Sequence, residues 1–119
     1  MSEGKIGQTI QIVIEKRTWL DRKKFEIPAE YIGFIPHDAL GARGKADLEK
    51  YPERGLSVEF DYGFEVVSCD VATRLSGAMR PRDNSCMKRF MEDKKAEIGD
   101  VVCVTKMEDR RFRISLVKR

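Results

Sequence analysis

Residues 56–62, LSVEFDY, show the clearest alternation of apolar and polar side chains in the chain. A period of two is typical of a β-strand with one buried face and one face in water. The side chains expected to face the interior are Leu56, Val58, Phe60 and Tyr62. This stretch therefore predicts a strand that packs on a β-rich core.

Further strands are expected on both sides of this segment. Gly63 permits a turn or bulge, after which residues 64–73 continue as a second strand. The other segments that read as strands are residues 8–15, 24–28, 100–105 and 111–119. Most of the chain is therefore expected in short strands.

Two short helices are expected between the strands. The first covers residues 28–34, because Pro28 suits a first helical turn and Pro36 stops the helix. The second follows an N-cap at Asp83 or Ser85. Its apolar stripe, expected in the core, consists of Met87, Phe90 and Met91.

About six or seven strands are too many for one flat sheet in a chain of 119 residues. Closure into a barrel would remove the exposed edges. Residues 37–55 read as a long excursion with partial helix, and residues 74–82 as an irregular basic stretch. The expected fold class is mainly β with short helices, in the form of an open barrel with helices over its ends.

The totals limit the class of protein. A length of 119 residues fits one domain, residues 1–119, and 41% hydrophobic with 36% charged residues is typical of a soluble chain. No apolar run approaches the roughly 18 residues of a membrane span, and the N-terminus lacks a hydrophobic signal region. Three cysteines without a C-x-x-C pair are expected as buried free thiols. We therefore expect a cytoplasmic protein with no membrane partner.

Catalytic and metal sites find little support in the sequence. The three cysteines and the single histidine, His37, lack the close spacing of a zinc site. A compact metal-dependent nuclease that uses Glu92 or Glu15 stays open as an alternative, since such enzymes gather acidic groups near a lysine. The chain alone is expected to be non-catalytic, with no cofactor and no metal.

Positive charge gathers in two segments that are distant in the sequence. The first is KRTWLDRKK, residues 16–24, and the second is residues 74–82 with the adjoining Lys88 and Arg89. Phosphate neutralisation attracts such segments to duplex DNA, and arginines can read guanine edges in the major groove. Charge alone also fits two solvated loops or a barrel that binds an acidic protein.

The order of elements resembles the B3 DNA-binding family. In that family a strand that ends in Ile-Pro leads into a short helix. A later helix with a Phe precedes a Gly-Asp step, a Val-rich strand, a loop and a last strand of F-x-I type. The matching residues here are Ile27 with Pro28, Phe90, Gly99 with Asp100, Val101–Val104 and Phe112–Ile114. The resemblance covers nearly the whole chain.

The resemblance implies a seven-stranded pseudobarrel that grips the DNA major groove through an N-arm and a C-arm. By position the N-arm would be residues 16–24, and the C-arm would lie within residues 70–82. The chain lacks the tryptophans that plant members carry near the C-arm, and its segment 37–55 is long. Both departures favour the branch of bacterial restriction endonucleases. The chain would then be the recognition or effector domain of such an enzyme, with a nuclease domain elsewhere in a larger protein.

The resemblance and the charge pattern together assign roles to single residues. Trp19 would buttress the first arm against the barrel, while the cations beside it bind phosphates and supply a base contact. In the second arm Arg74 would read a base, and Asp70 would accept from cytosine or pair with Arg74. Arg80 and Arg82 would clamp phosphates. The full set of expected DNA contacts is Lys16, Arg17, Trp19, Arg22, Lys23, Lys24, Asp70, Thr73, Arg74, Arg80 and Arg82.

Overall fold

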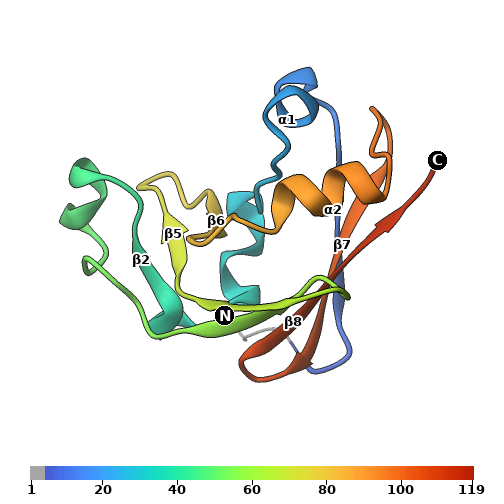
Figure 1. Cartoon of the computed structure of the whole chain (residues 1–119). Helices are drawn as coiled ribbons and strands as arrows, with labels where there is room; N and C mark the ends of the chain where they lie inside the picture. Colours follow the sequence, from blue (N-terminus) through green and yellow to red (C-terminus); the bar gives the residue numbers. More distant parts are fainter. Residues whose placement is uncertain (1–4) are drawn as a thin grey trace.

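The larger of two sheets holds five strands in the order β1-β7-β8-β3-β4 (Figure 1). The structure is a computed structural model that describes residues 5–119. β3 and β8 run parallel, and the other neighbouring pairs run antiparallel. The strands are β1 (Thr9–Val13), β3 (Val58–Asp61), β4 (Val66–Cys69), β7 (Val101–Glu108) and β8 (Arg111–Val117).

The smaller sheet has three short strands in the order β2-β5-β6. They are β2 (Leu40–Ala42), β5 (Val71–Thr73) and β6 (Met79–Pro81). β2 pairs with β5 in parallel, and β5 pairs with β6 in antiparallel orientation. β2 and β5 are buried along their whole length, which fits the continuous apolar character of LGA and VAT more than an alternating pattern.

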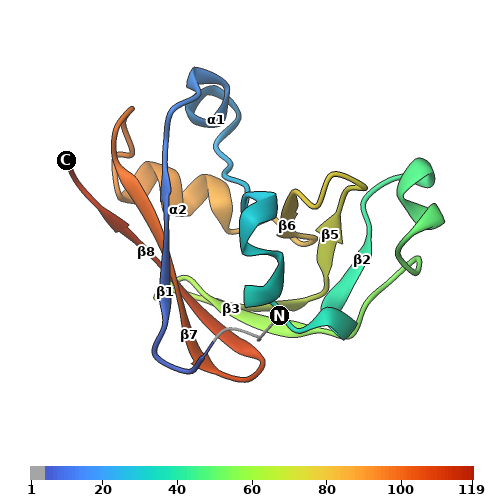
Figure 2. The ribbon, with the colours of Figure 1, turned by 180° about the vertical axis from the view of Figure 1, so that it is seen from behind.

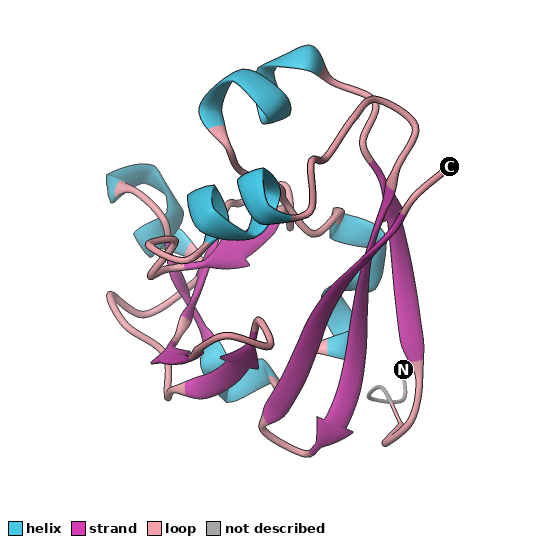
Figure 3. Cartoon of the chain, turned by 45° about the vertical axis from the view of Figure 1, so that its right-hand side comes forward, coloured by secondary structure: helices cyan, strands magenta, loops and turns pink. Residues whose placement is uncertain are grey.

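The chain passes from one sheet to the other at Asp70, between the end of β4 and the start of β5. A mainly β fold with short helices is confirmed. The strands nevertheless form two open mixed sheets rather than one barrel, and the described residues hold eight strands instead of the expected seven (Figure 3). Parallel pairing of distant segments, as in β2 with β5, is the feature that a reading of local patterns does not supply.

Short helices connect and cover the strands. The α-helices are α1 (Arg17–Arg22) and α2 (Met87–Asp93), and the 3-10 helices are η1 (Ala29–Phe34), η2 (His37–Ala39) and η3 (Lys45–Glu49). η1 confirms the short helix expected over residues 28–34, and it ends before Pro36. In the part of the chain that the structure describes, no helix has both the length and the apolar character needed to cross a bilayer.

Aromatic side chains fill the space between the sheets and α2. Phe112 packs on Phe60 and Phe34 with ring centroids 5.8 and 5.5 Å apart. Phe90 of α2 meets Phe25 edge to face at 6.4 Å and Tyr62 at 5.8 Å. Edge-to-face and offset contacts of this kind add to the free energy gained from burial.

The apolar stripe predicted for α2 is confirmed, because Met87, Phe90 and Met91 are all buried.

Four local expectations differ from the structure. The segment around Phe25 and Ile27 forms one isolated bridge rather than a strand, and the stretch expected as irregular contains β6. Leu56 is 62% exposed instead of buried. The N-cap of α2 is Cys86, without a side-chain hydrogen bond; Asp83 instead accepts a hydrogen bond from the backbone N–H of Ser85.

The three cysteines are free, as the sequence predicts. Cys86 and Cys103 are buried and Cys69 is half-buried. Burial is the main cause that raises the pKa of each thiol. Raised thiol pKa values make these groups poor nucleophiles.

Candidate nucleic-acid interface

The first basic segment, residues 16–24, contains the short helix α1. Trp19 and Leu20 anchor α1, because both are half-buried and pack against the hydrophobic core. The helix closes at Lys23, which adopts φ 53°, and the backbone N–H of Lys24 donates to the carbonyl of Trp19 at 2.9 Å. The outward side chains of Lys16, Arg17 and Arg22 are exposed. The apolar anchor therefore holds a row of cations toward solvent.

The second basic segment is the turn between β5 and β6. The backbone N–H of Arg74 donates to Ala78 at 2.9 Å, and that of Gly77 donates to Arg74 at 2.8 Å. Gly77 has φ 96°, and a Cβ there would lie 3.0 Å from the Cβ of Ala29, so glycine lets the turn rest on η1. The side chain of Arg74 is exposed at the tip.

Asp47 of η3 supports this turn from the other side. Its carboxylate accepts backbone hydrogen bonds from Gly44 and Leu75, each 2.9 Å long. These two hydrogen bonds lower the pKa of Asp47 most. Burial opposes them, and the charges of Arg74 and Arg43 add smaller lowering effects. An ionised Asp47 therefore ties the excursion 37–55, whose role the sequence did not explain, to the second basic segment.

The two basic segments are joined at their bases. Ile27, just after the first segment, and Met79, just after the turn, exchange backbone hydrogen bonds of 2.8 and 3.0 Å. Figures 1 and 2, which are opposite views, both show α1 and the β5–β6 turn reaching toward the same upper end of the molecule. Cations that are distant in the sequence are thus gathered on neighbouring parts of the surface.

Glu26 lies at the centre of this arrangement. Its carboxylate accepts a hydrogen bond from Arg43 Nη1 at 2.8 Å and lies 3.6 Å from Lys24 Nζ. Burial raises the pKa of Glu26, but the hydrogen bond and charge of Arg43 outweigh it, so that the net pKa is lowered. The charges of Lys24 and Arg74 act in the same direction. One carboxylate is thus surrounded by cations from both basic segments and from the residue that follows β2.

Arg80 forms no side-chain hydrogen bond and no ion pair among the described residues, although the charge of Glu26 acts to raise its pKa. It lies on β6, half-buried, and its Nε is buried without a hydrogen-bond partner. Burial, and after it the charge of Arg43, lower the pKa of Arg80. Nε of Arg43 is also buried without a partner. Buried donors are normally satisfied, so these two unpartnered N–H groups leave Arg43 and Arg80 incompletely hydrogen-bonded within the described residues.

Asp70, Thr73 and Arg82 belong to the internal framework instead of the surface. Arg82 binds Asp70 through two hydrogen bonds, Nε to Oδ1 at 2.6 Å and Nη2 to Oδ2 at 3.0 Å. Arg82 also donates to the carbonyl of Ala42 at 2.7 Å. Thr73 is fully buried and its hydroxyl donates to the carbonyl of Val71. The partner of Asp70 is therefore Arg82 rather than Arg74, and these three side chains are occupied within the protein.

A close backbone approach makes this ion pair possible. A Cβ on Gly41 would lie 2.2 Å from Oδ2 of Asp70, so only glycine fits there. The backbone N–H of Gly55 donates to the same oxygen at 2.8 Å. Burial raises the pKa of Asp70, but the hydrogen bonds of Arg82 and Gly55 lower it more. Asp70 is therefore ionised and fixes β2, the segment before β3 and the residue that follows β6 together.

Sequence reasoning missed Arg43. The stretch GARGK, residues 41–45, lacks the spacing of a phosphate-binding loop. In the structure it instead delivers Arg43 to Glu26, with the Arg43 side chain 8% exposed. The only local signal was an arginine between two glycines, which does not reveal a partner distant in the sequence.

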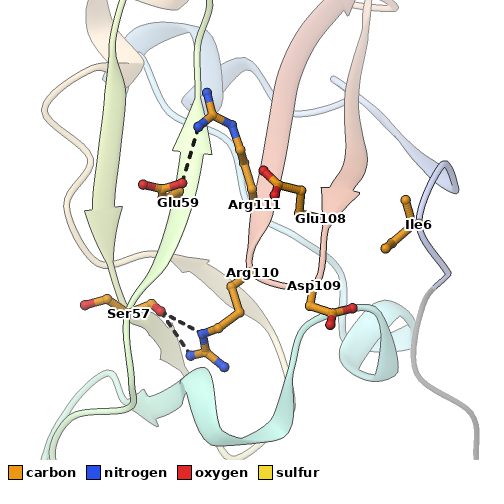
Figure 4. A pocket seen from close by; sticks show the side chains of 7 residues that line it. All are labelled: Ile6, Ser57, Glu59, Glu108, Asp109, Arg110 and Arg111. Carbon is orange, nitrogen blue, oxygen red and sulfur yellow. Dashed lines mark hydrogen bonds and ion pairs between the residues drawn. The ribbon is translucent and has the colours of Figure 1, made fainter.

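A hollow of about 450 Å³ lies at the β7–β8 hairpin (Figure 4). Both arginines that line it are engaged in ion pairs. Arg110 donates to the carbonyl of Ser57 and pairs with Asp38 at 2.7 Å. Arg111 pairs with Glu59 at 3.4 Å and with Asp61 at 3.2 Å. These guanidinium groups stabilise the hairpin against β3 and are less available to an anion than Arg80.

The acidic residues considered for a nuclease are separated by element. Glu15 follows β1, and Glu92 lies on the exposed side of α2. Within residues 5–119, no three His, Cys, Asp or Glu side chains are grouped so that they could hold a metal ion.

The comparisons with known proteins give a likeness of fold. No family model and no curated protein matches the sequence. The chain is similar in structure to a hypothetical Arabidopsis thaliana protein, with a TM-score of 0.50, 12% identity, and coverage of 97% of this chain and 96% of the other. The likeness extends over nearly the full length of both chains and concerns the fold alone.

Proposed function

We propose that this chain binds double-stranded DNA in a sequence-specific manner, through two basic arms that enter the major groove. The N-arm is residues 16–24 and the C-arm lies within residues 70–82, where residues 74–80 are proposed to face the DNA. In keeping with the B3 resemblance, the chain would serve as the recognition or effector domain of a bacterial restriction endonuclease. It would bind DNA while a separate nuclease domain cuts.

The observation that carries the proposal is the convergence of both basic segments around Glu26. Lys24 of the first segment and Arg74 of the second both act on that carboxylate, and Arg43 binds it directly. Concentrated positive charge attracts the phosphate backbone through release of counterions. Glu26 pairs with Arg43 and Lys24 and neutralises one of the three positive charges, so that the group keeps a net positive charge.

Separate roles are proposed for the cations. Lys16, Arg17 and Arg22 on α1 are exposed and suit phosphate contacts. Arg74 is exposed at the tip of the turn and suits direct base readout. Arg80 is half-buried on β6 and forms no ion pair among the described residues, so its guanidinium group suits a phosphate close to the protein surface. Asp70, Thr73 and Arg82 are left out of the contact set because their polar groups are engaged internally.

A selection from randomised duplexes, followed by titration at several salt concentrations, tests the proposal. We expect one enriched sequence and an affinity that falls steeply as salt rises. No duplex binding at low salt, or an affinity that does not change with salt, would overturn the proposal. Binding without any enriched sequence would overturn its specific part.

Two variants distinguish base readout by Arg74 from phosphate binding by Arg80. Arg74→Gln should weaken the selected sequence by about 1–3 kcal/mol and relax the preference at one base position. Arg80→Gln should weaken all duplexes by a similar factor and reduce the salt slope by about one. Arg113→Gln is the matched control, because Arg113 is exposed on β8 in the other sheet. Equal losses in all three variants would indicate net charge rather than a defined interface.

A further inference from the structure

A groove of about 450 Å³ lies beside β1, next to the basic arms. Its lining residues come from β1, from α1 with Trp19 and from η1 with Tyr31. In Figure 2 β1 and η1 run side by side in front, below α1. The lining residues with polar or aromatic side chains are Gln11, Glu15, Lys16, Trp19, Glu26, Glu30 and Tyr31.

β1 offers an open backbone edge to this groove. It lies at the edge of the larger sheet and pairs only with β7. Ile14 donates to the carbonyl of Asp100, and Gln8 accepts from Lys106, so the even-numbered residues bond to β7. By alternation the backbone N–H and C=O groups of Gln11 and Val13 face away from β7. Within the described chain they have no partner strand.

β1 also exposes an apolar side chain beside this open edge. Val13 is 42% exposed, although it lies in the middle of the pattern of isoleucines. Edge strands with unpaired backbone groups are templates for pairing with another chain, and native proteins usually blunt them. Here β1 carries neither a proline nor a lysine between Thr9 and Val13.

The charge of the groove is opposite to that of the arms. Glu15, Glu26 and Glu30 line it, against Lys16 alone. Glu26 is compensated by Arg43 at 2.8 Å and by Lys24 at 3.6 Å, whereas Glu15 and Glu30 form no ion pair among the described residues. The negative charge of the groove is therefore that of Glu15 and Glu30. Carboxylates repel phosphate, so the groove does not suit the DNA backbone. Trp19 and Tyr31 present aromatic rings, which attract cations through their faces.

We infer that the groove binds an extended, cationic segment of a partner protein, which adds to β1 as a further strand. Its backbone would pair with the outward groups of Gln11 and Val13, as in other cases of strand addition. Lysine or arginine side chains of the segment would lie against Trp19 and Tyr31, beside Glu15 and Glu30. This inference does not depend on DNA binding by the arms.

A peptide of alternating lysine and valine tests the inference directly. Trp19 is the only tryptophan of the chain and lines the groove, so its fluorescence reports binding. We expect a fluorescence change with a Kd below about 1 mM. Amide NMR spectra should show shifts and slowed hydrogen exchange at Gln11 and Val13. A peptide of alternating glutamate and valine should not bind.

Variants and a modified peptide separate the two parts of the recognition. Glu15→Gln with Glu30→Gln should weaken the lysine peptide about three- to tenfold. Glu49→Gln with Glu92→Gln, which neutralises two exposed carboxylates on η3 and α2, should leave the affinity unchanged. N-methylation of the lysine–valine peptide at alternate residues removes the backbone N–H donors along one of its two edges. We expect that this edge can no longer pair with β1.

Several results would overturn the inference. They are absence of binding by the lysine peptide, equal binding by the glutamate peptide, and equal weakening by both double variants. Amide shifts that leave Gln11 and Val13 unaffected would also overturn it, because the segment would then occupy another surface.

Discussion

Ile27 and Met79 exchange two backbone hydrogen bonds, 2.8 and 3.0 Å long, although they are distant in the sequence. Both side chains are fully buried. This pairing fixes the separation between the base of the first basic segment and the base of the second. The spacing of the two cation groups is therefore a property of the core rather than of the loops.

Ile27→Ala should lower the free energy of unfolding by about 2–5 kcal/mol, because the side chain is buried in a close-packed core. Urea titration followed by circular dichroism measures the change. Leu56→Ala is the control, since Leu56 is 62% exposed and should change stability by about 0.5 kcal/mol or less. Similar losses in the two variants would contradict the packing described for Ile27.

Asp70→Asn should destabilise the protein by about 3–5 kcal/mol, because Arg82 would lose its charged partner in a largely buried position. The comparison pair is Arg17 with Asp21, whose side chains are 78% and 64% exposed and 3.6 Å apart. Asp21→Asn should change stability by about 1 kcal/mol or less. A small effect of Asp70→Asn would show that water compensates Arg82.

Acid should unfold the protein through its carboxylates with lowered pKa values. Burial raises the pKa of Asp70, but the Arg82 and Gly55 hydrogen bonds hold it below the reference of 3.8; for Asp100 the Lys118 hydrogen bond lowers the pKa most. The stability from each group is present above its unfolded pKa and is lost as the pH falls through the lower folded pKa. The urea concentration at which half of the protein is unfolded should therefore decrease when the pH is lowered below about 4. Asp70→Asn should show a shallower fall than the native chain, and an unchanged acid slope would contradict the assignment.

Gly41→Ala should destabilise the protein by at least about 1–3 kcal/mol through overpacking. The added Cβ would meet Oδ2 of Asp70 at 2.2 Å and the backbone nitrogen of Gly55 at 2.8 Å. Gly44→Ala is the matched control, because its Cβ would meet Oδ2 of Asp47 at an ordinary 3.7 Å. Thermal unfolding of the two variants provides the comparison, and equal midpoints would exclude the close approach at Gly41.

The sequence predicted those elements whose local pattern reflects burial. Alternation in residues 56–62 led to β3, and the spacing of Met87, Phe90 and Met91 led to the buried face of α2. β2 was not predicted because its three residues are buried on both faces and pair in parallel with a distant strand. Such pairing leaves no alternation to detect.

The candidate site was predicted less fully than the fold. Charge density located both basic segments, since it is a local property of the sequence. It could not separate Arg80, which lacks a partner, from Arg82, which binds Asp70. That difference depends on Gly41 and Gly55 bringing their backbone close to Asp70, and the sequence alone does not state which segments meet.

The position of Asp70 between β4 and β5 has a consequence for how the molecule comes apart. The carboxylate that sits where the chain changes sheets is also held by Arg82 and Gly55 from two other segments. Neither sheet can separate without breaking contacts of the other at that point. We therefore expect the protein to unfold in a single cooperative step. The arrangement of the arginines in the two basic segments should then be lost in that same step and not gradually.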